Sequence, residues 1–383
     1  MLVLVMAGFG FGANTATVNS DGNGNSADIA QTGSNTADIE QIGNSQTATI
    51  GQNGTDNDGM AEQYGNGNAS DIAQVGSTNS AWTGQLDGDG NTADIDQDGT
   101  GNGAWVTQGM VENYYSDPNY QPSTSLPGNS NSASIDQGGA NNVGDVIQVG
   151  SGNAIDVDQS GSSNTAIVYQ GWAFGFWGET PVTSALSSYN STVTINQNTG
   201  DNYSAVWQYG GDNNSIAIDQ QGAANRTQIA QGFIYEDANY DFPHPIYNTN
   251  NNGATINQVG TDNSAKMFQL GDNNSFTLNQ NGASNTVGGR GLSGLEAIRN
   301  GYFDQGGNDN EFTGTQNDGA TLDDKSYQYG DSNDIDLIQN AGDVALIQQD
   351  GNSNNANNYQ YGGGQSSSII QTGDSNNASV TQN

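Results

Sequence analysis

A nine-residue pattern returns along most of the sequence and limits the folds that the chain can adopt. Residues 25–33 read NSADIAQTG and residues 35–43 read NTADIEQIG, so both follow Asn-x-Ala-x-Ile-x-Gln-x-Gly. Alternate residues of a β-strand point to the same face, so each copy places Asn, Ala, Ile and Gln on one face of a short strand. The Gly and the small polar residues after it are typical of turns. We call each copy an arm.

One arm carries too few apolar side chains to form a core, so arms must stack. Stacking buries the Ile residues, each worth about 1.5–3 kcal/mol. It also lets inward Asn and Gln bond their copies at the strand spacing of about 4.8 Å, whereas a buried amide without a partner would cost about 1–3 kcal/mol. We therefore predict an all-β solenoid with amyloid-like stacking, whose interior ladder includes Asn25, Gln31, Asn35, Gln41, Gln63, Gln74, Gln97, Gln137, Gln159, Gln220, Gln269 and Gln371.

The side chains that point outward predict how many arms make one turn. Counting the arm of Gln31 as the first, the residues beside Gln are mostly polar in odd arms and largely apolar in even arms. This alternation indicates two strands per turn of about 22 residues, hence two sheets. Twenty-eight arms would give about 14 turns and a rod of roughly 65–70 Å. One outer face should be acidic, and the other should carry Tyr64, Trp82, Trp105, Tyr169, Trp207, Tyr209, Phe268, Tyr327 and Tyr329.

The domain organisation follows from where the repeat is interrupted. Residues 1–13 form an apolar run that is typical of part of a secretory leader. Residues 14–383 then read as one solenoid with insertions at about 109–128, 171–189, 232–249 and 292–309, and Gly291 stands where a Gln is expected. Because the insertions are rich in aromatic residues, we expect them to fold over the aromatic face or to dock onto a neighbouring rod. The alternative is that they are passive loops.

Charge and composition exclude several functions. The chain has five Lys and Arg residues and 41 Asp and Glu residues, which gives a net charge of −36. Nucleic acid and anionic membranes are therefore poor partners. The single His244 lies between prolines, and outward Asp pairs recur without a unique cleft, so we predict no enzyme and no catalytic or metal-binding residue. With no Cys in the chain, we expect no thiolate site and no cofactor, apart from non-specific divalent cations on the acidic face.

The repeat resembles the curlin repeat of bacterial curli, the extracellular amyloid fibres of biofilms. Residues 263–271, NSAKMFQLG, fit that pattern as closely as residues 25–33 do. The resemblance implies a two-sheet β-solenoid, secretion through an outer-membrane channel, a nucleating partner and polymerisation into cell-surface fibres for adhesion. Lateral bundling through the aromatic face and the insertions is a further expectation.

The terminal arms lead to the same expectation of self-assembly. Soluble solenoids need polar caps over their open strand edges, and neither terminal arm reads as a cap. The polymerising ends should then include Asn14, Ala16, Val18, Asn376, Ala378, Val380 and Gln382. The alternative function is a monomeric secreted solenoid that binds calcium or ice. Ice binding would require a regular Thr array, which Asp and Ala interrupt.

Overall fold

A computed structural model describes residues 13–86, 88–109, 128–171, 188–232, 249–288, 303–323 and 325–383. These residues belong to two compact units, Met1–Val193 (unit 1) and Thr194–Asn383 (unit 2), which we describe separately. Within the described ranges the regular structure is entirely β, as predicted. The same ranges contain no helix of the length and apolar character needed to cross a membrane.

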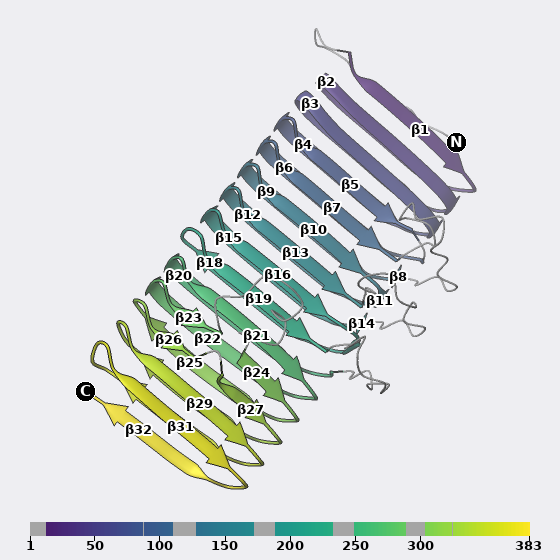
Figure 1. The fold of residues 1–383 in the computed structure, drawn as a ribbon. Coiled ribbons are helices and arrows are strands. Elements are labelled where there is room, and N and C mark those ends of the chain that lie inside the picture. The colour runs from purple at the N-terminus through teal and green to yellow at the C-terminus, as the bar shows by residue number, and fades with distance from the viewer. Residues whose placement is uncertain are drawn as a thin grey trace, which may run out of the picture. The chain divides into compact units, whose positions relative to one another are not determined.

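Unit 1 is a set of parallel strands in which each arm pairs with the arm two further along the chain. Thus β4 pairs with β6, and β5 pairs with β7. Odd arms therefore form one row, the odd sheet, and even arms form a second, the even sheet (Figure 1). The strands are β1 (Thr15–Asp21), β2 (Ser26–Asn44), β3 (Thr47–Asn66), β4 (Ala69–Ser77), β5 (Ser80–Gln85), β6 (Thr92–Thr100), β7 (Gly103–Gln108), β8 (Gly128–Asn129), β9 (Ser132–Ala140), β10 (Val143–Gln148), β11 (Gly150–Ser151), β12 (Ala154–Ser162), β13 (Thr165–Gln170) and β14 (Ser188–Tyr189).

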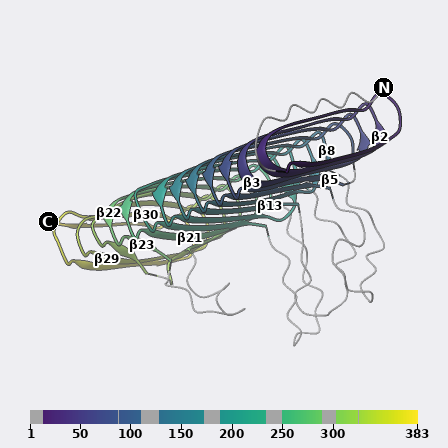
Figure 2. The ribbon, with the colours of Figure 1, turned by 90° about the horizontal axis from the view of Figure 1, so that it is seen from above.

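The strands β2 and β3 each run through two arms, so one half of each lies in the odd sheet and the other half in the even sheet. Residues 26–34 pair with residues 47–55, and residues 36–44 pair with residues 58–66. The chain bends between the halves, where the pairing register shifts near Ser34 and Thr36. Figure 2 shows the arcs of chain that join successive strands at this end of unit 1. Partners in one row lie about one turn apart, as the 22 residues between Gln41 and Gln63 show.

Unit 2 repeats the same pairing, for example between β19 and β21 and between β20 and β22. Its strands are β15 (Thr192–Gly200, which begins at the end of unit 1), β16 (Tyr203–Gln208), β17 (Gly211–Asp212), β18 (Ser215–Gln221), β19 (Arg226–Gln231), β20 (Gly253–Thr261), β21 (Ser264–Leu270), β22 (Ser275–Ala283), β23 (Thr286–Val287), β24 (Phe303–Gly306), β25 (Glu311–Asn317), β26 (Thr321–Leu322), β27 (Tyr327–Tyr329), β28 (Asp334–Gln339), β29 (Val344–Asp350), β30 (Asn355–Gln360), β31 (Ser366–Thr372) and β32 (Asn377–Gln382).

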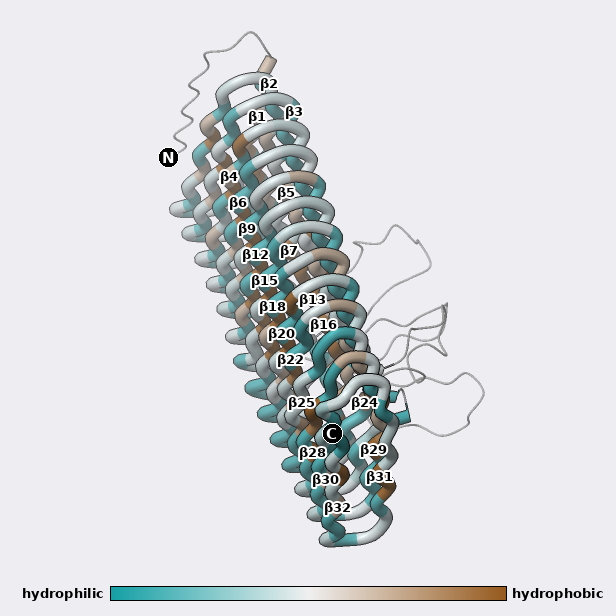
Figure 3. Tube along the Cα trace, turned by 90° about the vertical axis from the view of Figure 1, so that its left-hand side faces the viewer, coloured by the Kyte–Doolittle hydropathy of each residue, from teal (hydrophilic) through white to brown (hydrophobic). Residues whose placement is uncertain are grey.

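The core consists of the Ala and Ile positions of each arm, enclosed between the two sheets. In unit 1, Ile95 and Ile135 lie side by side in β6 and β9 and have no exposed surface. Apolar positions fall at the same place on successive strands, so brown segments line up along β4, β6, β9 and β12 in Figure 3. Inward apolar side chains thus lie beside their counterparts on neighbouring strands, where they are buried.

The structure corrects the prediction about Gly291 and the fourth insertion. Both β23 and β24 pair with β21, which brings Gln305 opposite Gln269. Residues 303–309 therefore belong to the coil, and the insertion predicted at about 292–309 interrupts an arm instead of following one. Phe303, which we expected in the insertion, is buried against Phe276 and Phe312, with ring centroids 5.6 and 4.7 Å away. A fixed spacing from one Gln to the next could not reveal an arm split in two.

Several predictions fall on residues that the structure does not describe. They comprise the leader at residues 1–12, His244, and the insertion aromatics Tyr114, Tyr115, Tyr120, Trp172, Phe174, Phe176, Trp177, Phe233, Tyr235, Tyr240, Phe242, Tyr247 and Tyr302. The roles predicted for these aromatic side chains therefore stay predictions.

Candidate functional site

Inward Gln side chains form two continuous hydrogen-bonded rows in unit 1. In the odd sheet each Gln Nε2 donates to the Oε1 of the next, from Gln31 through Gln52, Gln74, Gln97 and Gln137 to Gln159, at 2.7–2.8 Å. The even sheet contains the equivalent row that starts with Gln41 and Gln63. In unit 2, Gln220, Gln269 and Gln371 occupy corresponding rows. We call these rows the Gln ladders.

Ladder Gln residues also join the two sheets. The second N–H of Gln137 Nε2 donates to the carbonyl of Gly103 in β7, at 3.0 Å, across the interior. Gln63 does the same with Thr47 at 2.9 Å. One amide group therefore bonds along the coil and across it. This double role explains why the site demands Gln, since neither an apolar nor a shorter side chain provides both bonds.

Inward Asn side chains act at the corners and bond mainly to backbone. Asn35 Oδ1 accepts the backbone N–H of Asn57 at 3.2 Å, and Asn57 Oδ1 accepts that of Asn79 at 3.1 Å. The Nδ2 group of Asn57 donates to the turn carbonyl of Gly76 at 3.1 Å. Asn25 differs because the corresponding residue in the next turn is a Gln. Its Oδ1 accepts the backbone N–H of Gln46 at 3.1 Å. Amide-to-amide bonds also occur, since Asn57 Nδ2 donates to Asn35 Oδ1 at 3.1 Å, and in unit 2 the same bond repeats from Asn274 through Asn310, Asn333 and Asn354 to Asn376.

A further row of Asn and Asp residues, which the sequence analysis missed, lies at the turns of unit 2. The backbone N–H of each residue donates to the Oδ1 of the next at 2.8–2.9 Å, through Asp212, Asn250, Asp272, Asn308, Asp331, Asn352 and Asp374. Asn and Asp alternate strictly, so each carboxylate stacks on amides and not on another carboxylate. The alternation in residues that follow a turn was the available signal. We call this row the turn ladder.

The outer face of the odd sheet in unit 1 carries carboxylates on successive turns. Asp96 pairs with Asp136, and Asp136 pairs with Asp158. Burial and then the charges of neighbouring Asp residues raise the pKa values of Asp94 and Asp136. No group of acidic or His residues in the described ranges is arranged to hold a metal ion. We call this face the acidic ladder; its members are Asp71, Asp94, Asp96, Asp136, Asp156 and Asp158.

The raised pKa values predict that unit 1 gains stability as the pH falls from 7. An Asp whose folded pKa lies above its ordinary value of 3.8 binds protons more tightly in the folded state, so stability rises as the pH drops through the folded pKa. We expect a higher urea midpoint at pH 4.5 than at pH 7. The double variant Asp94→Asn/Asp136→Asn should raise the midpoint at pH 7 and weaken its pH dependence. An unchanged or lower midpoint at pH 7 would contradict this account.

The predicted aromatic residues lie on the outer face of the even sheet in their own units. In unit 1 Tyr64, Trp82 and Tyr169 are half-buried and Trp105 is exposed. The Trp82 indole donates to Glu62 at 3.2 Å and the Tyr169 hydroxyl to Asp145 at 2.9 Å. In unit 2 the members are Trp207, Tyr209, Phe268, Tyr327 and Tyr329, and the last two stack with centroids 4.7 Å apart.

The edge arms of the described structure are less covered than the interior ones. Ala16 and Val18 in β1 are half-buried, whereas their partners Ala37 and Ile39 are fully buried. In unit 2 Ala378 and Val380 of β32 are likewise half-buried, as are the two remaining predicted residues at this edge, Asn376 and Gln382. Asn14 accepts the backbone N–H of Asn35 at 2.9 Å. Apolar and amide groups of the same repeat are therefore available at both edges.

The parallel strand pairing and the Gln ladders are those of a repeat protein of the β-solenoid class. Five segments match the model of the curlin associated repeat, at residues 34–58, 54–85, 128–161, 190–222 and 249–282. These five repeats support a curlin-repeat family for the chain, a family that is structural and not catalytic. No curated protein matches the sequence.

Proposed function

We propose that this protein is a non-enzymatic structural subunit that self-assembles end to end into an extracellular, curli-like amyloid fibre. The subunit would be a two-strand-per-turn solenoid of about 22 residues per turn and about 14 turns. The fibre would serve adhesion and the biofilm matrix at the cell surface. Its partners would be further copies of itself, a secretion channel and a nucleator, and it would need no cofactor. Family membership supports this role.

One structural observation carries the proposal, namely the direction of the ladders. In the odd sheet of each unit, the Nε2 of one Gln donates to the Oε1 of the Gln in the following turn. Gln382 in unit 2 therefore presents a donor at the C-terminal edge, and Gln31 in unit 1 presents an acceptor at the N-terminal edge. No described residue fills either position. The donor of one copy suits the acceptor of the next, so the Gln ladder can continue from copy to copy.

Two more rows have matching ends. In the Asn row the later backbone N–H donates to the earlier Oδ1, which leaves the Oδ1 of Asn376 for the N–H of Asn25 in a second copy. In the turn ladder the direction is reversed, which leaves the N–H of Asp374 for the Oδ1 of Asn23. In the Gln ladder and the turn ladder the donor belongs to the earlier turn, whereas in the Asn row it belongs to the later turn. Only head-to-tail contact between two copies therefore places a donor opposite an acceptor in all three rows.

A charge placed at the joint should stop growth without unfolding the subunit. In head-to-tail register, Val380 would lie beside Ile29 of the next copy. Within the chain, Val380 pairs with Asn358 and Ile29 pairs with Ile50 in the same way. The variant Val380→Lys buries an ammonium group there, which costs several kcal/mol, and should slow seeded elongation at least tenfold while the soluble protein keeps its β circular dichroism.

The neighbouring residue supplies the control for this experiment. Thr381 lies in the same strand and is exposed, so Thr381→Lys adds the same charge outside the joint. We expect it to elongate at the parent rate. Equal elongation by Val380→Lys and the parent would argue against an end-to-end joint.

A further inference from the structure

The few positive charges of this chain are unevenly distributed. The five Lys and Arg residues are Arg226, Lys266, Arg290, Arg299 and Lys325, so unit 1 contains none. The acidic ladder of unit 1 therefore has no Lys or Arg of its own unit to neutralise it. Its carboxylates repel one another, which contributes to the raised pKa values of Asp71, Asp94 and Asp136.

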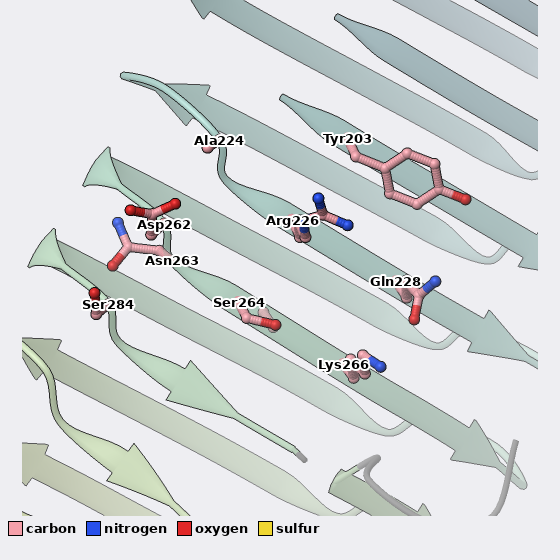
Figure 4. Close-up of a pocket in the computed structure, with 10 residues that line it drawn as sticks. Tyr203, Ala224, Arg226, Gln228, Asp262, Asn263, Ser264, Lys266 and Ser284 are labelled. Atoms are coloured by element: carbon pink, nitrogen blue, oxygen red, sulfur yellow. The ribbon is translucent and has the colours of Figure 1, made fainter. Parts of the chain in front are cut away.

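Two of these cations lie together in unit 2, on the outer side of β16, β19 and β21. In the strand register Arg226 lies between Tyr203 and Ser264, and Gln228 lies beside Lys266. These five residues line a cavity of about 770 Å³, together with Ala224, Asp262, Asn263, Ala265 and Ser284. Figure 4 shows Tyr203, Arg226, Gln228 and Lys266 on one side of these neighbouring strands. We call these four residues the basic pocket.

The electrostatics of the basic pocket favour an anion. Burial and then the charge of Arg226 lower the pKa of Lys266. The Arg226 charge also acts on Tyr203, whose pKa is raised by burial. A carboxylate between the two cations would relieve their repulsion. Lysine and the guanidinium group of Arg would both donate charge-assisted hydrogen bonds to it.

We propose that the basic pocket receives carboxylates of the acidic ladder of a second copy, so that copies associate side by side. This lateral contact goes beyond end-to-end assembly and does not depend on it. It joins the outer face of the even sheet in unit 2 of one copy to the outer face of the odd sheet in unit 1 of another.

Spacing and charge both favour a second copy as the occupant. Arg226 and Lys266 lie on adjacent strands and are offset by two residues, because Lys266 pairs with Gln228. Asp94 and Asp136 lie on adjacent strands with the same offset, because Asp136 pairs with Asp96. Two carboxylates of the acidic ladder therefore have the same diagonal arrangement as the two cations. Sheets pack face to face at about 10 Å, a gap that the long side chains of Arg and Lys can span. The contact also offsets the repulsion within both faces.

Carbodiimide cross-linking of the full chain tests the contact, because this reagent joins an amine directly to a carboxylate that touches it. Mixing ¹⁵N-labelled and unlabelled protein identifies links between copies. We expect Lys266 to be linked between copies to Asp94, Asp96, Asp136 or Asp158, with a yield that falls as the salt concentration rises. The variant Arg226→Glu keeps the Lys266 amine and should lower the yield at least tenfold. The matched variant Lys325→Glu, at an exposed cation, should leave the yield unchanged.

The remaining outcomes separate this proposal from the proposed function. Intermolecular links without fibres would support the lateral contact and contradict end-to-end growth. Fibres in which Lys266 forms no link to the acidic ladder would overturn the lateral contact alone. Links from Lys266 to an added polyuronate, with none to Asp, would also overturn it, because the occupant would then be an acidic polysaccharide. As a second variant, Arg226→Glu/Lys266→Glu/Asp96→Lys/Asp136→Lys should restore intermolecular links with the charges exchanged.

Discussion

Replacing Gly139 by Ala should destabilise unit 1 by about 3–5 kcal/mol, combining backbone strain with the displacement of packed chain. Gly139 has a φ of +102°, and a Cβ atom there would lie 2.0 Å from the carbonyl oxygen of Gly161 in the next turn. The clash is with backbone, so no side-chain rotation relieves it. The stacked turns must separate locally, and we expect a large fall in the urea midpoint together with faster amide exchange in β9 and β12.

The neighbouring glycine provides a control for this prediction. A Cβ atom on Gly138 would meet nothing within 4 Å, and its backbone is not in the left-handed region. The variant Gly138→Ala should therefore change the free energy of unfolding by less than about 0.5 kcal/mol. Equal effects of the two substitutions would show that the turns are not stacked as described.

Replacing Gln137 by Leu should destabilise the protein by about 2–5 kcal/mol, because it removes the partners of three buried groups. These groups are an N–H of Gln97, the Oε1 of Gln159 and the carbonyl of Gly103. Leu has nearly the volume of Gln, so the loss measures hydrogen bonding and not a cavity. Urea unfolding of the variant and the parent measures the difference.

Gln221 is the matched control for the ladder prediction. Its side chain is exposed and lies outside the Gln ladders, and its Nε2 donates to the Oδ2 of the half-buried Asp219 at 2.8 Å. We expect Gln221→Leu to change stability by less than about 0.5 kcal/mol. A Gln137→Leu variant as stable as Gln221→Leu would mean that the Gln ladders add nothing to stability.

Much of the fold could be predicted because one short pattern specifies it repeatedly. The period-2 placement of Ala and Ile indicates which face is buried, and Ile95 and Ile135 are buried accordingly. The alternating polarity beside Gln indicates that arms pair with the second arm along, as β4 and β6 do. Each inference needs only local geometry, since every arm pairs with neighbouring arms of nearly the same sequence.

The features that sequence reasoning missed depend on neighbours that the pattern does not specify. Gln305 joins a Gln ladder because β24 pairs with β21 beside Gln269, although 15 residues, 288–302, separate β24 from β23 in the sequence. The turn ladder depends on the position of a backbone N–H one turn away, so the alternation of Asn and Asp after the turns was its only sequence signal. The basic pocket arises because residues far apart in sequence, such as Tyr203 and Lys266, come to lie on neighbouring strands.

The central claim is that the full chain polymerises end to end. Electron microscopy of the purified protein, diluted from denaturant with and without calcium, tests it most directly. The account predicts unbranched fibres that grow without calcium and give a reflection at about 4.8 Å along the fibre axis. Stable monodisperse particles under both conditions would contradict end-to-end assembly, and fibres that form only with calcium would show that the acidic face, not the open edges, controls it.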